Sequence, residues 1–298
     1  MTILEAAVLG FVQGVGEFLP ISSSGHLVLF QRIFGISEGA MSFDIAVHLG
    51  TLAALIAVMR KRLLMYIKNP LGRVPVMVVV GTIPTAAIAF VLEKIISSLF
   101  ESGASLGMGF LLTASLLWFA ETWSGRMAAR RERSAGRGIG EANVGDALAI
   151  GIAQGVATVP AISRSGSTIA AGLVCGLGRE AAVEYAFLLS IPATLLAVAN
   201  DILGMATGSG AAGATAGATA GAAASAAAAS ADAASAAAGV GALPTVVGVL
   251  VSMAVGFPAA QLMLRRIRKI NLKWFAAYAF ALGALILVDQ LFIGVLFG

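Results

Sequence analysis

The most informative shortage in this chain is a shortage of charge. Only 11% of its 298 residues are charged, whereas 59% are hydrophobic and the mean hydropathy is +0.95. A soluble domain carries about 25% charged residues, so the composition excludes a water-soluble globular protein and indicates an integral membrane protein. Cysteine is nearly missing as well. The single Cys175 excludes an intrachain disulfide and is expected to be a small buried residue.

Two further shortages narrow the function. The first twelve residues lack a basic segment and carry Glu5 instead, so no cleavable signal peptide is expected. The net charge of +4 comes without aromatic residues interleaved among the basic ones, which argues against nucleic-acid binding. Histidine occurs only twice, as His26 and His48, so any imidazole chemistry must use one of these two side chains.

Apolar residues, by contrast, come in long runs. Six stretches can cross a bilayer as helices, which takes about 20 residues each. Fifteen of the nineteen lysine and arginine residues lie in the loops after the first, third and fifth stretches. The positive-inside rule therefore places these three loops in the cytoplasm and both termini outside. The six predicted spans cover residues 43–59, 74–92, 105–122, 183–205, 243–264 and 274–297.

Two parts of the chain are near copies of each other, 141 residues apart. Residues 13–25 match residues 154–166 at seven of thirteen positions. Residues 44–58 likewise correspond to 184–198, with acid on acid and apolar on apolar, although the charge rule gives these two helices opposite directions. This combination predicts an inverted-topology repeat, whose axis lies in the membrane plane.

Each copy of the motif is too broken to be one spanning helix. Pro20 and Gly25 interrupt the first copy, and Pro160 and Gly166 interrupt the second. Broken backbone at membrane depth is tolerated only where protein or a water-filled cavity satisfies it. We therefore predict two re-entrant helix-loop-helix hairpins with tips that meet near the midplane. The predicted units of this single membrane domain, 1–298, are repeat one (1–122, with its hairpin at 1–35) and repeat two (145–298, with its hairpin at 145–178).

Residues 206–242 stand apart, because they are almost wholly Ala, Gly, Ser and Thr, with Asp232 as the only charge. We expect a flexible or partly helical linker outside the cell. A seventh spanning helix is the rival interpretation. It would move the basic loop at 265–273 outside, which the charge rule opposes.

The first copy of the motif carries acid and base groups. Gln13 and Glu17 are four residues apart and share one face of a helix. An ionisable group inside a membrane is costly and indicates function, so Glu17 is a candidate metal ligand, together with Gln13, or a general base. The alternative is a structural hydrogen bond from Glu17 to nearby backbone donors.

Three serines follow, and they precede a new apolar run. Ser22, Ser23 and Ser24, with Gly25, are suited to cap a helix whose free amide groups form an anion site. Ser23 beside His26 is a candidate nucleophile–base pair. Helix capping alone would explain one serine, and a lone histidine in an apolar segment can be a satisfied core residue.

The second copy carries Arg164 where the first has Ser23. Its guanidinium offers a rigid donor fork for phosphate, and the neighbouring hydroxyl and amide groups complete an anion cradle. The alternative is a buried ion pair with Glu17, Asp44 or Glu184. We expect Asp44 and Glu184 to contact and orient the residues that bind the ligand, and His48 to be structural. The predicted members of the cradle are Ser163, Ser165, Gly166 and Thr168, with Ser167 nearby.

Both motifs resemble those of the bacterial undecaprenyl-diphosphatase family, known also for bacitracin resistance. The matching segments read Gln-Gly-x-x-Glu-Phe-Leu-Pro-x-Ser-Ser-x-Gly-His and Pro-x-x-Ser-Arg-Ser-Gly-x-Thr. The similarity covers nearly the whole chain, including 81–84 and 184–192, and excludes 206–242. The chain departs from the family pattern at Ala161, where glycine is usual, and at Gly16, where threonine is common.

The resemblance implies removal of the terminal phosphate from undecaprenyl diphosphate, which gives the monophosphate carrier used in cell-wall synthesis. It places the protein in the bacterial plasma (inner) membrane as a multi-pass enzyme, and a homodimer is a further expectation. The family's acidic motif matches Gln13 and Glu17, its serine and histidine match Ser23 and His26, and its arginine motif includes Arg164. The family is served by a divalent cation, Mg²⁺ or Ca²⁺, which phosphate oxygens and Glu17 would share.

The sequence leaves the nucleophile open among Ser23 with His26 as its base, His26 itself, and an activated water. It also leaves a rival function, a transporter or flippase for an anionic lipid, because inverted repeats with broken helices are typical of transporters. Glu17 with His26 argues for the enzyme, since a carrier needs an anion site but has no evident need for a Ser–His pair.

Overall fold

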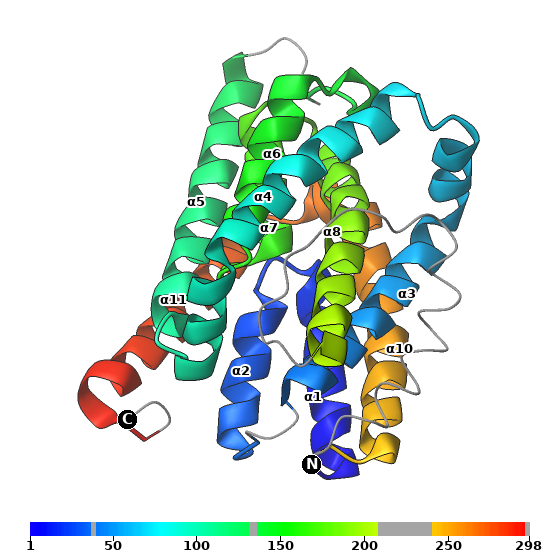
Figure 1. The fold of residues 1–298 in the computed structure, drawn as a ribbon. Coiled ribbons are helices and arrows are strands. Elements are labelled where there is room, and N and C mark those ends of the chain that lie inside the picture. The colour runs from blue at the N-terminus through cyan, green and yellow to red at the C-terminus, as the bar shows by residue number, and fades with distance from the viewer. Residues whose placement is uncertain (37–39, 131–135, 208–239, 296–298) are drawn as a thin grey trace.

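The structure is a computed structural model that describes residues 1–36, 40–130, 136–207 and 240–295, and its regular elements are helices (Figure 1). The all-α prediction is therefore confirmed for the described residues. Most of the predicted 206–242 linker lies outside them. The elements are α1 (Ile3–Phe18), α2 (Ser23–Ile33), α3 (Ala40–Lys68), α4 (Arg73–Ser102), α5 (Leu106–Arg130), η1 (Ile139–Glu141), α6 (Val144–Val156), α7 (Arg164–Val174), α8 (Arg179–Thr207), α10 (Ala242–Arg266), η2 (Ile267–Lys269), α11 (Leu272–Val288) and η3 (Asp289–Ile293).

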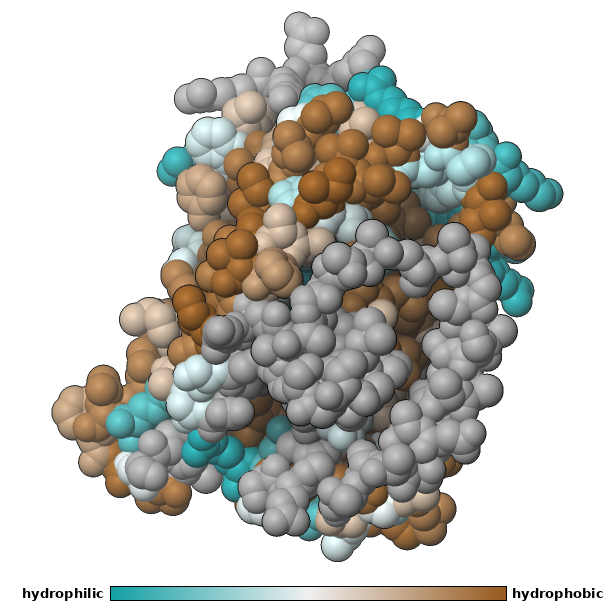
Figure 2. Space-filling view, viewed as in Figure 1, coloured by the Kyte–Doolittle hydropathy of each residue, from teal (hydrophilic) through white to brown (hydrophobic). Residues whose placement is uncertain are grey.

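Six helices are long and apolar enough to cross a membrane, so the predicted number of spans is confirmed for the described part of the chain. Hydrophobic side chains cover much of the visible face of α4 and α5 (Figure 2), where Val79, Ile83, Leu112 and Leu116 are exposed. A surface of this kind is suited to lipid, so the protein is a multi-pass membrane protein. The spans are Ser42–Lys68, Arg73–Leu92, Leu106–Met127, Arg179–Ala199, Ala242–Lys269 and Leu272–Ile293.

The helices extend further than the apolar runs that predicted them. Arg60, Lys61 and Lys68 were expected in a loop, yet they lie on the last turns of α3. Arg126 likewise lies on α5. Lysine and arginine are good helix formers, and a helix satisfies its own backbone in water as well as in lipid, so a basic boundary does not end it.

The basic ends of α3, α5 and α10 meet the start of α8. Three ion pairs join them, each with a nitrogen–oxygen distance of 2.6 Å. Glu184, expected to support the site, is instead engaged here by Arg62 and by the hydroxyl of Tyr66 at 3.3 Å. The predicted basic loops therefore gather at one end of the molecule. The three pairs are Arg62–Glu184, Arg179–Glu121 and Arg268–Glu180.

A second contact closes the same end between α6 and α7. Arg137, just before η1, donates two hydrogen bonds of 2.8 Å to the two carboxylate oxygens of Asp146 on α6. It also donates to the carbonyl oxygen of Cys175 at the end of α7. Arg137 therefore joins the start of α6 to the end of α7, through a bidentate ion pair on one side and a carbonyl on the other. Cys175 itself is partly buried and makes no disulfide.

Glycine allows the first helix of each motif to pack closely on a helix from the other half of the chain. A Cβ placed on Gly10 of α1 would overlap the carbonyl oxygen of Gly248 on α10. A Cβ on Gly151 of α6, 141 residues after Gly10, would overlap the carbonyl oxygen of Gly81 on α4. Small residues at such contacts let helix backbones approach, which is the main source of helix association in a membrane.

Each motif forms a helix, a short loop and a second helix, which are α1–α2 and α6–α7. The prolines lie in the loops as predicted, but Gly25 and Gly166 do not break a helix: each is the third residue of the second helix. Glycine is required at Gly25 for space, because a Cβ there would come within 2.9 Å of the Cα of Ala161. The two loops are thus packed against each other.

Candidate active site

The two loops meet through an ion pair between the two copies of the motif. Nη2 of Arg164 lies 2.9 Å from Oε1 of Glu17, and the side chains keep 25% and 13% exposure. The hydroxyl of Ser165 donates to the carbonyl oxygen of Leu19 at 3.1 Å. Of the three carboxylates considered as partners of Arg164, the structure selects Glu17. The acid/base half and the anion-binding half of the chain therefore form one site.

The second helix of each motif begins in the same way. Ser22 caps α2 by accepting from the amide of Gly25 at 3.3 Å, and Ser163 caps α7 by accepting from the amide of Gly166 at 3.0 Å. In each case the serine two residues after the cap places its hydroxyl near that of the cap. The distance is 3.4 Å from Ser24 to Ser22 and 3.3 Å from Ser165 to Ser163. Two helix N-termini with hydroxyl groups thus lie at the junction, an arrangement that favours anions.

The loop before α7 is braced from α5 by a residue that the sequence did not single out. Thr113 donates to the carbonyl oxygen of Ala161 at 3.1 Å and accepts from the amide of Ser163 at 2.9 Å. Ala161 has a φ of 66°, in the left-handed region that favours glycine. The family pattern's glycine at this position therefore has a conformational reason, and this chain tolerates alanine there.

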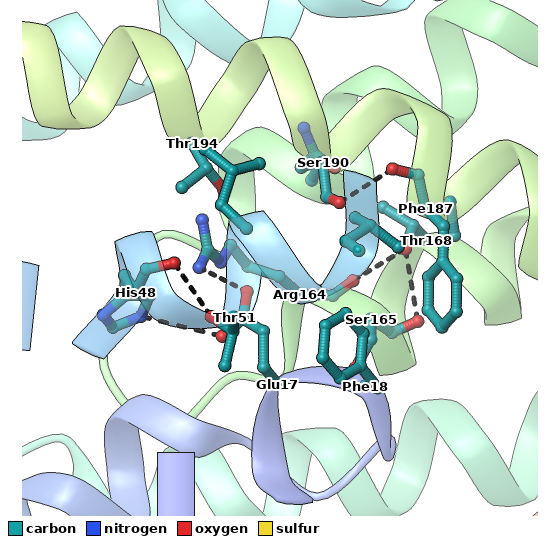
Figure 3. A pocket seen from close by; sticks show the side chains of 14 residues that line it. Glu17, Phe18, His48, Thr51, Arg164, Ser165, Thr168, Phe187, Ser190 and Thr194 are labelled. Carbon is teal, nitrogen blue, oxygen red and sulfur yellow. Dashed lines mark hydrogen bonds and ion pairs between the residues drawn. The ribbon is translucent and has the colours of Figure 1, made fainter. Parts of the chain in front are cut away.

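Glu17 is the centre of the hydrogen bonds in the site. Its Oε2 accepts from Nε2 of Gln13 at 3.0 Å and from the hydroxyl of Ser23 at 2.8 Å. Nε2 of His48 lies 3.6 Å from the same oxygen (Figure 3). Its other oxygen accepts from Arg164. A carboxylate held by this many groups is oriented firmly, and its bond from Ser23 places it where a base would act.

A pocket opens beside this carboxylate (Figure 3), and its empty space of about 420 Å³ includes open solvent. Its lining includes Arg164 among several polar residues. Its apolar lining residues are Phe18, Leu52, Leu55, Ala186 and Phe187. A lining that combines polar and apolar side chains suits an amphipathic ligand. The remaining polar lining residues are Glu17, His48, Thr51, Gln154, Ser165, Thr168, Ser190 and Thr194.

His48, which the sequence analysis treated as structural, lies in the pocket. Its Nδ1 lies 2.6 Å from the carbonyl oxygen of Asp44 one turn earlier, which sets the ring's orientation. The carboxylate of Asp44 accepts from Nε2 of Gln31 at 2.6 Å, so this side chain is engaged away from Arg164, and only the backbone of Asp44 contacts His48. The spacing of His48, Thr51 and Leu55 on one helix face was the available signal, because it places two polar groups on an otherwise apolar stripe.

His26, which the sequence analysis favoured, lies on the other side of α2. Its Nδ1 is 2.7 Å from the carbonyl oxygen of Ser22, and its Nε2 is 2.7 Å from the hydroxyl of Tyr278. Within the described residues, no bond joins this ring to Ser23, whose hydroxyl is committed to Glu17. The expected Ser23–His26 pair is therefore not formed in this structure, and Glu17 takes the place beside the serine.

A divalent cation can be tested against the donors that are present. Oε1 of Gln13 is buried and makes no hydrogen bond to any described residue, although Nε2 of the same amide donates to Glu17. In the described ranges, no group of three or more His, Cys, Asp or Glu side chains could hold a metal ion. Mg²⁺ is commonly bound by one or two protein oxygens together with substrate phosphates, so Gln13 and Glu17 fit a cation that arrives with a diphosphate.

Other predicted cradle members support Arg164 from its own helix. The hydroxyl of Thr168 lies 2.8 Å from the carbonyl oxygen of Arg164 and lines the pocket, whereas the buried hydroxyl of Ser167 has no partner. Gly16 packs against Ser23: a Cβ there would come within 2.9 Å of the serine Cα. The glycine at position 16 therefore leaves room for the turn that carries Ser23.

Known proteins were compared with this sequence. The model of the family "Bacitracin resistance protein BacA" matches residues 6–285. An undecaprenyl-diphosphatase of Carboxydothermus hydrogenoformans is 40% identical over 97% of this chain and 98% of its own length. One from Desulfatibacillum aliphaticivorans is 37% identical over 96% and 98%, and one from Methanosphaera stadtmanae is 40% identical over 70% and 79%. Because the match extends over nearly the whole chain, this protein belongs to the bacitracin resistance protein BacA family.

Proposed function

We propose that this protein is an undecaprenyl-diphosphatase, which hydrolyses undecaprenyl diphosphate to undecaprenyl phosphate and inorganic phosphate. It is a hydrolase that acts on the phosphoanhydride of a polyprenyl diphosphate, as its relatives' names state for them. The observation that carries the proposal is the convergence on Glu17 of Ser23 from one motif and Arg164 from the other. A nucleophile, a base and an anion clamp are thereby in one place.

The substrate would bind with its diphosphate at the junction of the two loops. Arg164 would turn from Glu17 to the phosphate oxygens, and the N-termini of α2 and α7 would add amide donors. The prenyl chain would lie against the apolar wall that includes Leu55 and Phe187. The charge that develops during transfer would then meet donors that are already oriented.

The bond from Ser23 to Glu17 supports a specific first step. The hydroxyl oxygen of Ser23 would attack the terminal phosphorus while its proton passes to the Glu17 carboxylate. The bond from that phosphorus to the bridging oxygen would break, and undecaprenyl phosphate would leave with the electron pair. Water would then hydrolyse the phosphoserine and restore the Ser23 hydroxyl. A divalent cation held by Gln13, Glu17 and the diphosphate would supply neutralising charge.

The finer fold prediction is also part of the proposal. We infer an inverted-topology repeat in which α1–α2 and α6–α7 are re-entrant hairpins in the bacterial plasma membrane. Two observations support it: α1 packs on α10 as α6 packs on α4, through Gly10 and Gly151, and the end of α3 meets the start of α8, so that these related helices run oppositely. A homodimer remains an expectation from the family resemblance.

The test is phosphate release from undecaprenyl diphosphate by detergent-purified protein, with and without a chelator. We expect turnover that Ser23→Ala abolishes and Glu17→Gln strongly lowers, and a phosphoserine at Ser23 that can be trapped by rapid acid quenching. Ser124→Ala is the matched control, since among the described residues the Ser124 hydroxyl bonds only its own helix. Turnover without any phosphoserine would assign the attack to water or histidine. No turnover, with transport of the lipid between leaflets of a vesicle, would establish the flippase instead.

A further inference from the structure

The second partner of His26 comes from the far end of the chain. Nε2 of His26 lies 2.7 Å from the hydroxyl oxygen of Tyr278 on α11, 252 residues later. The two rings are nearly parallel, with planes 5° apart and centroids 5.7 Å apart. Phe110 of α5 meets the imidazole edge-on, at 5.1 Å and 89°. Two helices that do not line the pocket therefore hold this ring in place.

The chemistry of the two partners determines which nitrogen of His26 carries hydrogen. A backbone carbonyl oxygen only accepts, so at 2.7 Å from the Ser22 oxygen Nδ1 must be the donor. In a neutral ring Nε2 then has no hydrogen and must accept, and the hydroxyl of Tyr278 donates to it. The Ser22 carbonyl thus fixes the tautomer, and the bond from Tyr278 at the opposite nitrogen fixes the position of the ring.

The carbonyl that His26 binds lies in the residue that sets the catalytic turn. Ser22 has a φ of 69°, which is unfavourable for a residue with a side chain, and Ser23 follows it directly. The hydroxyl of Ser23 reaches Glu17 at 2.8 Å only while this turn is kept. A strained turn of this kind persists when its surroundings hold it, and the bond from His26 is one of those restraints.

We propose that Tyr278 is a positioning residue for the nucleophile, acting through His26. Its hydroxyl holds the His26 ring at Nε2, the ring so placed directs Nδ1–H at the Ser22 carbonyl, and the held turn presents Ser23 to Glu17. The inference rests on the proposed function only for the role of Ser23. It also gives His26 a role that needs no contact with the substrate, in agreement with its position outside the pocket.

The first test is spectroscopic and does not depend on turnover. The chain has two histidines, so selective ¹⁵N labelling of histidine gives two ring systems, which the His48→Gln variant assigns. In the wild type we expect His26 to show a protonated Nδ1 and an unprotonated, hydrogen-bonded Nε2. In Tyr278→Phe, which keeps the ring stacking, the Nε2 signal should shift to that of a nitrogen without a hydrogen bond, and the Nδ1–H proton should show a weaker bond to the Ser22 carbonyl. Unchanged His26 signals would overturn the proposal.

The second test is kinetic. Loss of one net hydrogen bond from the chain of contacts predicts about a tenfold fall in kcat with KM changed less than about twofold. Tyr66→Phe, which removes a bond to Glu184 away from the pocket, should leave both constants unchanged. In a His26→Ala background, Tyr278→Phe should have no further effect. An equal effect of Tyr278→Phe in the wild type and in His26→Ala would refute action through His26. If the wild type itself has no phosphatase activity, the proposed function is refuted, but the spectroscopic test of the contact between Tyr278 and His26 still applies.

Discussion

The replacement of Arg164 by lysine separates charge from geometry in the anion clamp. Arg164 reaches Glu17 with Nη2 at 2.9 Å and lines the pocket with a quarter of its side chain exposed. Its planar fork can bind two phosphate oxygens at once. A lysine keeps the positive charge but offers a single compact ammonium, so it cannot reproduce a two-point contact.

The magnitude follows from the bonds at stake. A hydrogen bond to a charged group contributes about 1.5–3 kcal/mol, so losing one of two phosphate contacts should lower kcat/KM by roughly 10–150-fold. Arg164→Ala loses the charge as well and leaves the 13%-exposed Glu17 without its cation. Breaking a buried pair in this way costs about 3–5 kcal/mol, so we expect that variant to lose both lipid binding and turnover.

The assay is initial-rate phosphate release at several lipid concentrations, with binding measured on the same preparations. Arg62→Lys is the matched control, because Arg62 pairs with Glu184 in a half-exposed ion pair at the basic end of the molecule. We expect that control to behave as the wild type. Wild-type kcat/KM in Arg164→Lys would refute the two-point clamp, because the fork geometry would then contribute nothing to the transition state.

Three further predictions concern the candidate base Glu17, the packing of Gly151 on α4 and the ion pair between Arg137 and Asp146. Glu17→Gln should lower turnover by roughly 10²–10⁴-fold while the lipid still binds, so wild-type turnover would remove Glu17 from proton transfer. Gly151→Ala should lower the stability in detergent by about 1–3 kcal/mol, because the added methyl meets a carbonyl of α4, whereas Gly125→Ala, with open space around it, should not. Burial raises the pKa of Asp146, but the hydrogen bonds from Arg137 and the Asn143 amide, together with the charges of Arg137 and Arg73, outweigh burial and hold that pKa below the ordinary 3.8. The pair therefore stabilises the protein fully above pH 3.8 and loses its effect as the pH falls through the lowered pKa; thermal melting at acidic pH should show this loss in the wild type and not in Asp146→Asn.

The spans and the main features of the site could be predicted because they depend on local pattern. Long apolar runs bounded by basic residues predict spanning helices directly. Glu17 and Arg164, 147 residues apart, could be placed together because they lie in the two copies of the motif, whose hairpin tips were predicted to meet. Glycines were harder, because Gly25 and Gly166 have the sequence appearance of helix breaks. The reason for Gly25 is a tertiary contact with Ala161, and the reason for Gly166 is its local contact with the capping Ser163.

The roles of the two histidines could not be predicted, because each depends on helices far away in sequence. His26 is next to three serines in the chain, but the Ser23 hydroxyl bonds Glu17 instead, and the His26 ring bonds the Ser22 carbonyl and the hydroxyl of Tyr278. His48 has no neighbouring motif, yet the crossing of α3 over the tip of α1 brings it to within 3.6 Å of Glu17. Proximity in sequence is a poor guide to proximity in a bundle of long helices.

The close approach of Gly10 to Gly248 has a consequence for how the protein is made. The ribosome delivers α1 first, but the helix that accepts its glycine face is synthesised more than two hundred residues later. Until then α1 has only earlier helices such as α2 and α3 to pack on, whereas α6 finds α4 already inserted. The acidic half of the site is thus translated first and receives its glycine-lined packing partner last, so a ribosome stalled before α10 would carry a chain that holds Glu17, Ser23 and Arg164 without the helix that α1 packs on.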